Sequence, residues 1–125
     1  MRSRFSLPTR DPRTRLDEML DAVVWIERIP AGATVASYLA DRPMRDAVER
    51  NLERLSEASR HLPEAMLRRH EAIPWRQVRD LGNVLRHGYH AVEDQQVWVI
   101  VVRDLPRLRV SVEAMLVELG AGEPS

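Results

Sequence analysis

The sequence contains no cysteine, so the protein forms no disulfide bonds and offers no thiolate ligand to a metal ion. Long apolar runs are also lacking. The longest, residues 97–102, is too short to span a bilayer, and the N-terminal residues show no signal-peptide pattern. An excess of either charge is missing too: 19 basic residues balance 19 acidic ones, so any contact with nucleic acid must come from a local cluster. These absences predict a cytoplasmic protein without a membrane segment.

The chain has the length and composition of a single globular domain. It contains 125 residues, of which 44% are hydrophobic, enough for one core. Residues 1–12 are polar and basic, so we expect an N-terminal tail there. We expect a helical bundle over residues 13–120 and a C-terminal tail over residues 121–125.

Hydrophobic residues recur every three or four positions along most of the chain, which is the period of an amphipathic helix. The first such stretch ends by Pro30 and Gly32, and a second begins near Thr34 with a break near Pro43. Further stretches reach residue 69, run from residue 74 to about 87, and cover residues 105–120. The pattern predicts an all-α fold, an antiparallel bundle of four to five helices.

Residues 95–102 are ambiguous. Their valines and tryptophan favour a strand by propensity. We predict a helix nevertheless, because no other part of the chain offers a partner strand.

The predicted helix that ends near residue 87 carries many polar side chains on one face. At about 100° per residue, Val78, Leu81 and Leu85 form its apolar stripe. The opposite arc holds Arg76, Arg79, Asn83, Arg86 and His87. Such a face is either solvated and paired with acids such as Asp80 and Glu57, or it binds phosphate, for which arginine offers a two-pronged donor. The pattern alone leaves both interpretations open.

His87 adds chemical options to this face. Histidine titrates near neutrality, so it can accept and release a proton at working pH. In RNA cleavage a base takes the proton of the 2′-hydroxyl, which attacks the adjacent phosphate while cations stabilise the transition state. A histidine near a helix end is also often structural. A metal site is not indicated, because His87 and His90 flank Gly88 and no cysteine supports them.

Three segments resemble the HepT-like proteins of the HEPN superfamily. They are RDPRTRLDEMLDAV near the start, DAVERNLERLSEAS in the middle, and IPWRQVRDLGNVLRHGYHAVEDQQVW after it. Together they cover most of the chain in the expected order. The resemblance implies a dimerising four- or five-helix bundle that is a ribonuclease toxin, paired with a small nucleotidyltransferase antitoxin that can modify it.

The resemblance also implies candidate site residues. Family members carry an arginine, four to six further residues and then a histidine, often within His-x-Tyr. His87 and Tyr89 match the His-x-Tyr part, and Asn83 matches an asparagine that follows the motif arginine. Gly82 stands where that arginine is expected. Either Arg79 or Arg86 could therefore replace it, or the site is degenerate.

Three further positions gain interest from the resemblance, and Arg76 joins them from its place on the basic face of the predicted helix. Tyr89 resembles the tyrosine that a partner nucleotidyltransferase adenylylates, which would block the basic cleft by bulk and by charge. Glu57, Asn51 and Arg76 are accessory candidates near that cleft. Each of the four is also explained as an ordinary surface or helix-packing residue.

The leading hypothesis is a metal-independent endoribonuclease toxin that acts as a homodimer on RNA, needs no cofactor and is silenced by a cognate minimal nucleotidyltransferase antitoxin. Its expected catalytic residues are His87, Arg79, Arg86 and Asn83. Two alternatives stay open: a catalytically inactive binding partner of a nucleotidyltransferase, and a plain helical dimerisation module.

Overall fold

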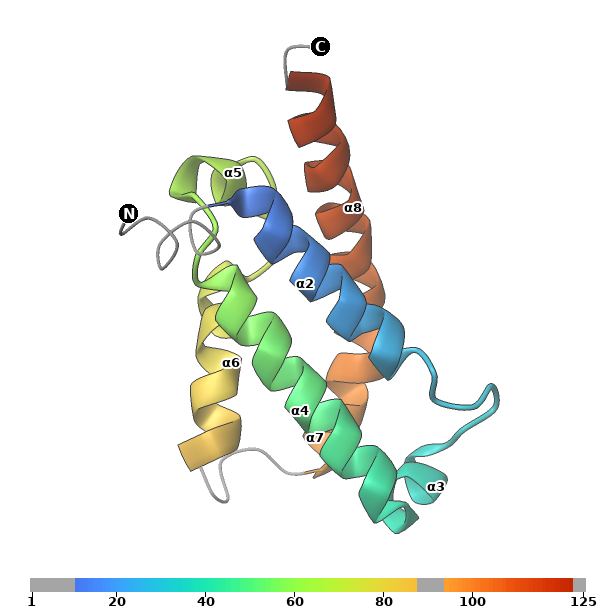
Figure 1. The fold of residues 1–125 in the computed structure, drawn as a ribbon. Coiled ribbons are helices and arrows are strands. Elements are labelled where there is room, and N and C mark those ends of the chain that lie inside the picture. Colours follow the sequence, from blue (N-terminus) through green and yellow to red (C-terminus); the bar gives the residue numbers. More distant parts are fainter. Residues whose placement is uncertain (1–10, 88–93, 123–125) are drawn as a thin grey trace, which may run out of the picture.

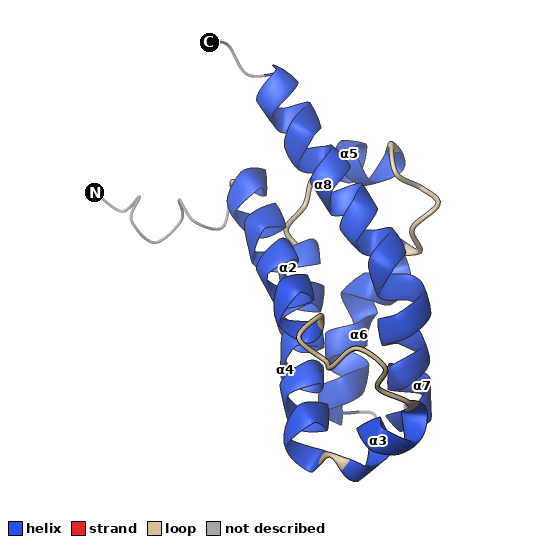
Figure 2. Ribbon diagram, turned by 90° about the vertical axis from the view of Figure 1, so that its right-hand side faces the viewer, coloured by secondary structure: helices blue, strands red, loops and turns tan. Residues whose placement is uncertain are grey.

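The computed structural model describes residues 11–87 and 94–122, and every regular element within these ranges is a helix (Figures 1 and 2). The elements are α2 (Pro12–Ile26), α3 (Val35–Ala40), α4 (Arg42–Ser59), α5 (Glu64–Arg68), α6 (Trp75–His87), α7 (Asp94–Val99), η3 (Ile100–Asp104) and α8 (Leu105–Gly122). The predicted all-α fold is confirmed.

The long helices alternate in direction, as an antiparallel bundle requires (Figure 1). Helices α2 and α6 run one way, and α4 and the continuous stretch from α7 to α8 run the other way. The short helices α3 and α5 lie in the connections on either side of α4. Helix α4 is central: it packs extensively against α2 and against α6, whereas α8 packs mainly against α2. Helix α6 is therefore held to the bundle chiefly by α4.

Side-chain caps explain where the first helices begin. Asp11 accepts a hydrogen bond from the backbone of α2, and Thr34 and Ser37 cap α3 reciprocally. Asp41 caps α4 and ends α3, so the break expected near Pro43 lies two residues earlier. Pro43 occupies the first turn of α4, where its missing N–H would have no partner in any case.

The core is built from the apolar stripes that the sequence shows. The fully buried large side chains come from α2, α3, α4, α7 and α8: Leu16, Met19, Val23, Ile26, Tyr38, Leu52, Leu55, Val97, Val112 and Met115. Most are aliphatic, and burying each contributes roughly 1.5–3 kcal/mol. None of these largest fully buried side chains comes from α6, which joins the core through the buried Trp75 at its start and through half-buried leucines and valine further along.

Residues 95–102 are helical, as predicted. They form α7 and most of η3, a wide π-helical turn that ends just before Pro106. The N–H of Leu105 bonds to the carbonyl of Ile100, one residue further back than in an α-helix. Proline has no N–H and its ring crowds the preceding turn. The wider turn lets the chain continue as a helix across Pro106 despite both effects.

Candidate functional site

Helix α6 is anchored at its start and rests on α4. The indole N–H of Trp75 donates to the carbonyl of His70 at 2.9 Å, and the Trp75 side chain is buried. Gly82 is the other buried residue of α6, while the expected stripe of Val78, Leu81 and Leu85 is only half-buried. The contact with α4 therefore runs through Gly82, to one side of the predicted stripe.

Gly82 faces Ser56 of α4 at very short range. Its N–H donates to the Ser56 hydroxyl at 2.9 Å, and that hydroxyl donates to the carbonyl of Arg79 at 3.1 Å. A Cβ at Gly82 would lie 3.2 Å from the Ser56 Oγ and 3.3 Å from its Cβ. The glycine thus lets the two helices approach closely. From the sequence, Gly82 could be noticed only because it stands where the motif arginine is expected. The sequence does not show which residue of α4 lies against it.

The Arg86 side chain turns back toward Gly82. Its Nη1 lies 3.3 Å from the position that a Gly82 Cβ would take. Arg86 lines a hollow together with residues from α2 and α4, namely Arg15, Glu18, Arg50, Glu53, Arg54, Glu57 and Ala58. The structure therefore brings two predicted residues, Arg86 and Glu57, into one hollow.

The other arginines of this hollow have carboxylate partners. The pairs are Arg15 with Glu18 at 3.0 Å, Arg54 with Asp21 at 3.1 Å and Arg50 with Glu53 at 3.9 Å. Glu57 lies 3.1 Å from the imidazole of His61. Arg86 has no ion pair or hydrogen bond among the described residues, so it is the one cation of the hollow whose charge stays uncompensated.

Asn51, Arg76 and Arg79 are predicted residues that lie outside this hollow. Asn51 makes its hydrogen bonds along α4, donating to the carbonyl of Ala47 and accepting from Arg54. Arg76 and Arg79 line a separate hollow with Arg60 and Asp80. Gly82 and its contact with α4 stand between Arg79 and Arg86 along α6, so the structure does not gather the two arginines at one point.

Asn83 and His87 lie on the exposed face of α6. Neither makes a hydrogen bond or ion pair with another described residue. The other two described histidines do: His61 contacts Glu57, and His70 contacts Glu118 at 3.1 Å. Among the described residues, nothing therefore occupies the His87 side chain. The predicted positions Gly88, Tyr89 and His90 lie outside the described residues.

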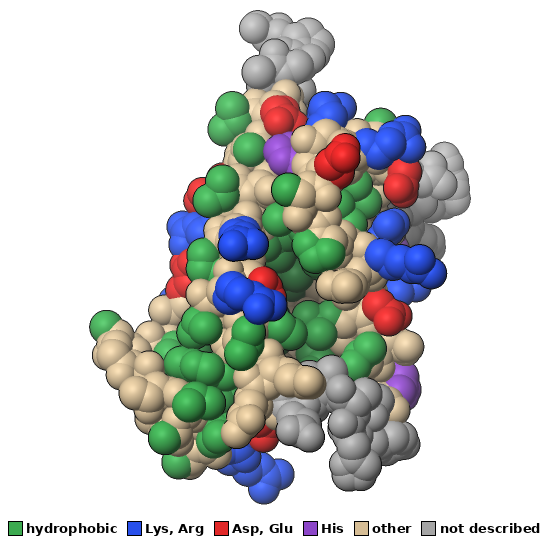
Figure 3. Space-filling model, turned by 180° about the vertical axis from the view of Figure 1, so that it is seen from behind, with side chains coloured by type: hydrophobic (Ala, Val, Ile, Leu, Met, Phe, Trp, Pro, Cys, Tyr) green, Lys and Arg blue, Asp and Glu red, His purple; other side chains and the backbone are tan. Residues whose placement is uncertain are grey.

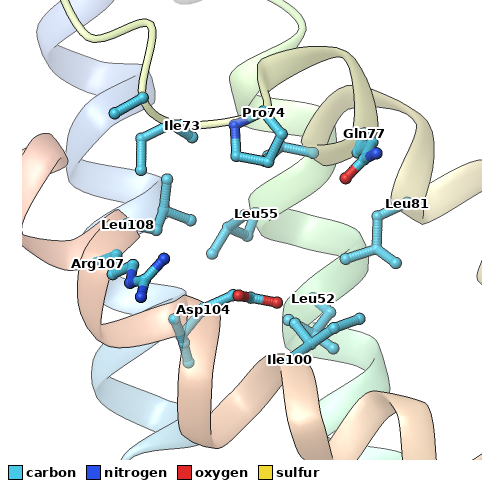
Figure 4. Close-up of a pocket in the computed structure, with 13 residues that line it drawn as sticks. Leu52, Leu55, Ile73, Pro74, Gln77, Leu81, Ile100, Asp104, Arg107 and Leu108 are labelled. Carbon is cyan, nitrogen blue, oxygen red and sulfur yellow. The ribbon is translucent and has the colours of Figure 1, made fainter.

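An apolar groove adjoins α6 on the side away from its arginines (Figures 3 and 4). It is lined by Leu52 and Leu55 of α4, by Val78 and Leu81 of α6, and by Ile100, Leu105 and Leu108 of η3 and α8. Gln77, Asp104 and Arg107 are among its polar residues. The groove could not be predicted from the sequence, because it depends on how far α6 stands from η3.

No three histidine or acidic side chains of residues 11–87 and 94–122 lie close enough to hold a metal ion together. None of the helices in these ranges has the length and apolarity needed to cross a bilayer.

The fold and this surface define a small protein, helical throughout its described ranges, with an exposed histidine in the last turn of one helix and, just before it, an arginine that has no partner among the described residues. Comparison with known proteins gives the class a name. A family profile described as Ribonuclease HepT-like matches residues 19–115, most of the chain. The chain belongs to the HepT-like ribonuclease family.

Relatives from three organisms carry names that refer to this activity. "Probable ribonuclease HepT" of Thermococcus cleftensis is 30% identical over 106 residues, covering 85% of this chain and 96% of that protein. A "Putative RNase" of Caldanaerobacter subterraneus subsp. tengcongensis is 24% identical over 107 residues, 86% of this chain and 96% of that protein. A "Putative RNase" of Methanocaldococcus jannaschii is 26% identical over 113 residues, 90% and 93% of the two chains. No solved structure matches the chain.

Proposed function

We propose that this protein is a metal-independent endoribonuclease toxin that acts in the cytoplasm as a homodimer and is silenced by a cognate minimal nucleotidyltransferase antitoxin. Membership of the HepT-like ribonuclease family supports RNA as the substrate. The toxin role, the partner and the independence of metal extend beyond that membership. They follow from the resemblance of the motif around His87 and from the chemistry of its neighbours.

In this proposal His87 removes the proton from a ribose 2′-hydroxyl. The 2′-oxygen attacks the adjacent phosphorus, and the bond from phosphorus to the 5′-oxygen breaks. The products are a 2′,3′-cyclic phosphate and, once the leaving oxygen takes a proton from water, a 5′-hydroxyl. Negative charge builds up on the phosphoryl oxygens during the attack, and a guanidinium group held beside them lowers the barrier.

The observation that carries the proposal is the position of Arg86. Its guanidinium lies next to Gly82, the position of the missing motif arginine, and has no partner among the described residues. It belongs to the residue just before His87 and is itself exposed. Arg86 thus supplies the positive charge that the family motif takes from the position of Gly82.

The remaining candidates take supporting roles. Asn83 lies one turn before His87 and orients the phosphate or the imidazole by hydrogen bonds. Glu57, which lines the hollow of Arg86, and Asn51, further along α4, act as accessory residues. Arg79 and Arg76 supply positive charge further along α6.

Dimerisation and silencing complete the proposal. A second copy that covers the apolar groove beside α6 would bury Val78 and Leu81 and bring two α6 helices together. The antitoxin would adenylylate Tyr89, two residues beyond His87, and the added nucleotide would exclude RNA by bulk and charge.

The decisive experiment measures cleavage of total RNA by the purified protein. His87→Ala should lower the rate by about 10²-fold or more, the usual contribution of a general base. His70→Gln, which changes a histidine at the contact with Glu118 on α8, should leave the rate close to that of wild type. Cleavage should persist in EDTA. Unchanged cleavage by the His87→Ala protein would refute the assignment.

The second candidate is a catalytically inactive binding partner of a nucleotidyltransferase, favoured by Gly82 in the place of the motif arginine. It predicts no cleavage by the wild-type protein and unchanged cellular toxicity for His87→Ala. Expression with and without the neighbouring gene, followed by analysis of total RNA, separates the two candidates.

A further inference from the structure

A second arginine-lined hollow lies at the N-terminal half of α6. Its lining residues are Arg60, Arg76, Arg79 and Asp80, so three guanidinium groups meet one carboxylate. Arg60 comes from the end of α4 and the other three from α6. The two elements are tied together here, because the Nη1 of Arg60 donates to the carbonyl of Arg79 at 3.3 Å. The fold itself therefore holds these like charges near one another.

The charges of this hollow are poorly compensated from within the protein. Arg79 lies 3.5 Å from Glu64, whose side chain is 61% exposed, which makes a weak surface pair. Arg60 and Arg76 have no carboxylate within ion-pair distance among the described residues. Most described arginines elsewhere have one, as Arg109 does with both Glu27 and Glu113.

The hollow also lies on the same face of α6 as His87. Arg76, Arg79, Asn83 and His87 share one arc of the helix, and eleven residues separate Arg76 from His87. At a rise of 1.5 Å per residue this spans about 16 Å. A stacked strand rises ~3.4 Å per nucleotide along its axis, so about five nucleotides cover the distance, and fewer when the strand is extended.

We propose that the hollow of Arg60, Arg76 and Arg79 binds the phosphate backbone of single-stranded RNA a few nucleotides away from the cleaved bond. This inference rests on the proposed ribonuclease function and adds a requirement for substrate length. An RNA of three nucleotides reaches only the end of α6 near His87 and Arg86. A longer strand also gains the contacts with Arg60, Arg76 and Arg79, and guanidinium groups suit phosphate because each can donate two parallel hydrogen bonds.

Binding can be measured separately from cleavage. The probe is an end-labelled 12-nucleotide 2′-O-methyl RNA, which has no 2′-hydroxyl to attack the phosphate, followed by fluorescence anisotropy at several salt concentrations. Arg60→Ala combined with Arg76→Ala should weaken binding of this probe about tenfold or more. Binding of a three-nucleotide probe should change less than about twofold. The dependence of log K on log salt should fall by about 0.7 for each arginine removed.

Matched variants test whether the location of the charge decides the effect. Arg42→Ala combined with Arg109→Ala removes the same charge from elsewhere and should weaken binding of the long probe far less. Arg60→Lys combined with Arg76→Lys should restore most of the binding. Equal losses in both double alanine variants would overturn the inference, because net charge alone would then explain them.

The result also separates this inference from the function on which it rests. Suppose that the double alanine variant binds the long probe as well as wild type does, and that cleavage still depends on His87. This result would overturn only the proposed RNA-binding role of the hollow, and an acidic protein surface would then be its candidate occupant. If binding depends on RNA length through Arg60 and Arg76, but cleavage is unchanged by His87→Ala, only the assignment of His87 as the general base would be overturned.

Discussion

Like charges lie close together at both ends of α4, but they are carboxylates at one end and arginines at the other. In its first half, Glu49 lies near Asp94, Asp46 and Glu53, and partial burial together with these carboxylates, Asp94 foremost, raises the pKa of Glu49. At its other end, Arg60 lies with Arg76 and Arg79 of α6. A carboxylate can relieve repulsion by binding a proton, whereas arginine stays charged at any pH at which the protein is folded.

This difference indicates where an outside partner is needed. All 19 basic residues of the chain are arginines, so no basic side chain has the option of losing its proton near neutrality. The acidic end of α4 can adjust with pH alone. The basic end has Asp80 and the exposed Glu64 for three arginines, so an anion from outside is needed to neutralise the remaining positive charge.

The largest effect is expected from removing Arg86, the arginine beside His87 that has no partner in the described part of the chain. Arg86→Ala should lower kcat/KM for RNA about 10²-fold, since it takes away a cation that stabilises the charged transition state. Arg42→Ala, which removes an exposed arginine from the acidic end of α4, should cost less than about threefold. Cleavage assays on a defined RNA measure both. If Arg79→Ala costs more than Arg86→Ala, the roles of the two arginines must be exchanged.

A smaller effect, on stability, is expected from placing an arginine at position 82. Gly82→Arg places an arginine where the family motif has one, but the new Cβ would crowd the Ser56 hydroxyl. Overpacking of this kind costs about 1–3 kcal/mol. Asn83→Arg adds the same charge on the exposed face and should change the free energy of unfolding by no more than about 0.5 kcal/mol. Urea unfolding compares the two, and equal stability would mean that α4 and α6 do not depend on the glycine.

The smallest effect is expected at the acidic end. The pKa of Glu49 is raised in the folded protein, so the folded state holds this proton more tightly than the unfolded chain does. The resulting stability is fully present below the ordinary pKa of 4.5 and is lost as the pH rises through the folded-state value.

Glu49→Gln removes this loss. The variant should match wild type near pH 4 and be more stable at pH 7, by no more than about 0.5 kcal/mol because solvent screens a partly exposed group. Urea unfolding at both pH values checks this, with Glu71→Gln as the control at an exposed position. A stability difference that is the same at both pH values would contradict the argument.

The helical fold was predictable from the sequence because its core lies in regular stripes. Leu16, Met19 and Val23 recur at helical spacing and are fully buried. Residues 95–102 required a different argument, the lack of any partner strand, and they too are helical. The π-helical turn before Pro106 could not be predicted, since a wide turn depends on how the helices on either side pack and has no sequence period of its own.

The candidate site was predictable as a face of one helix and no further. A helical wheel places Arg79, Arg86 and His87 on one arc, but it says nothing about α4. The separation of Arg79 from Arg86 by the Gly82 contact is a property of two packed helices. The same holds for Arg60, which lies at the end of α4 and was not a candidate. The sequence shows Arg60 only as an arginine near the end of a neighbouring helix, and its contact with Arg79 depends on how the two helices pack.

The contact between Ser56 and Gly82 has a consequence for the evolution of the family. Because the serine hydroxyl lies close beside the glycine, a side chain at position 82 would require Ser56 to shift, so we expect the two positions to change together. Relatives that carry arginine at the position of Gly82 should have glycine or alanine at the position of Ser56, or helices that stand further apart. Covariation between these two positions, 26 residues apart in sequence, would record how the motif arginine was exchanged for close packing.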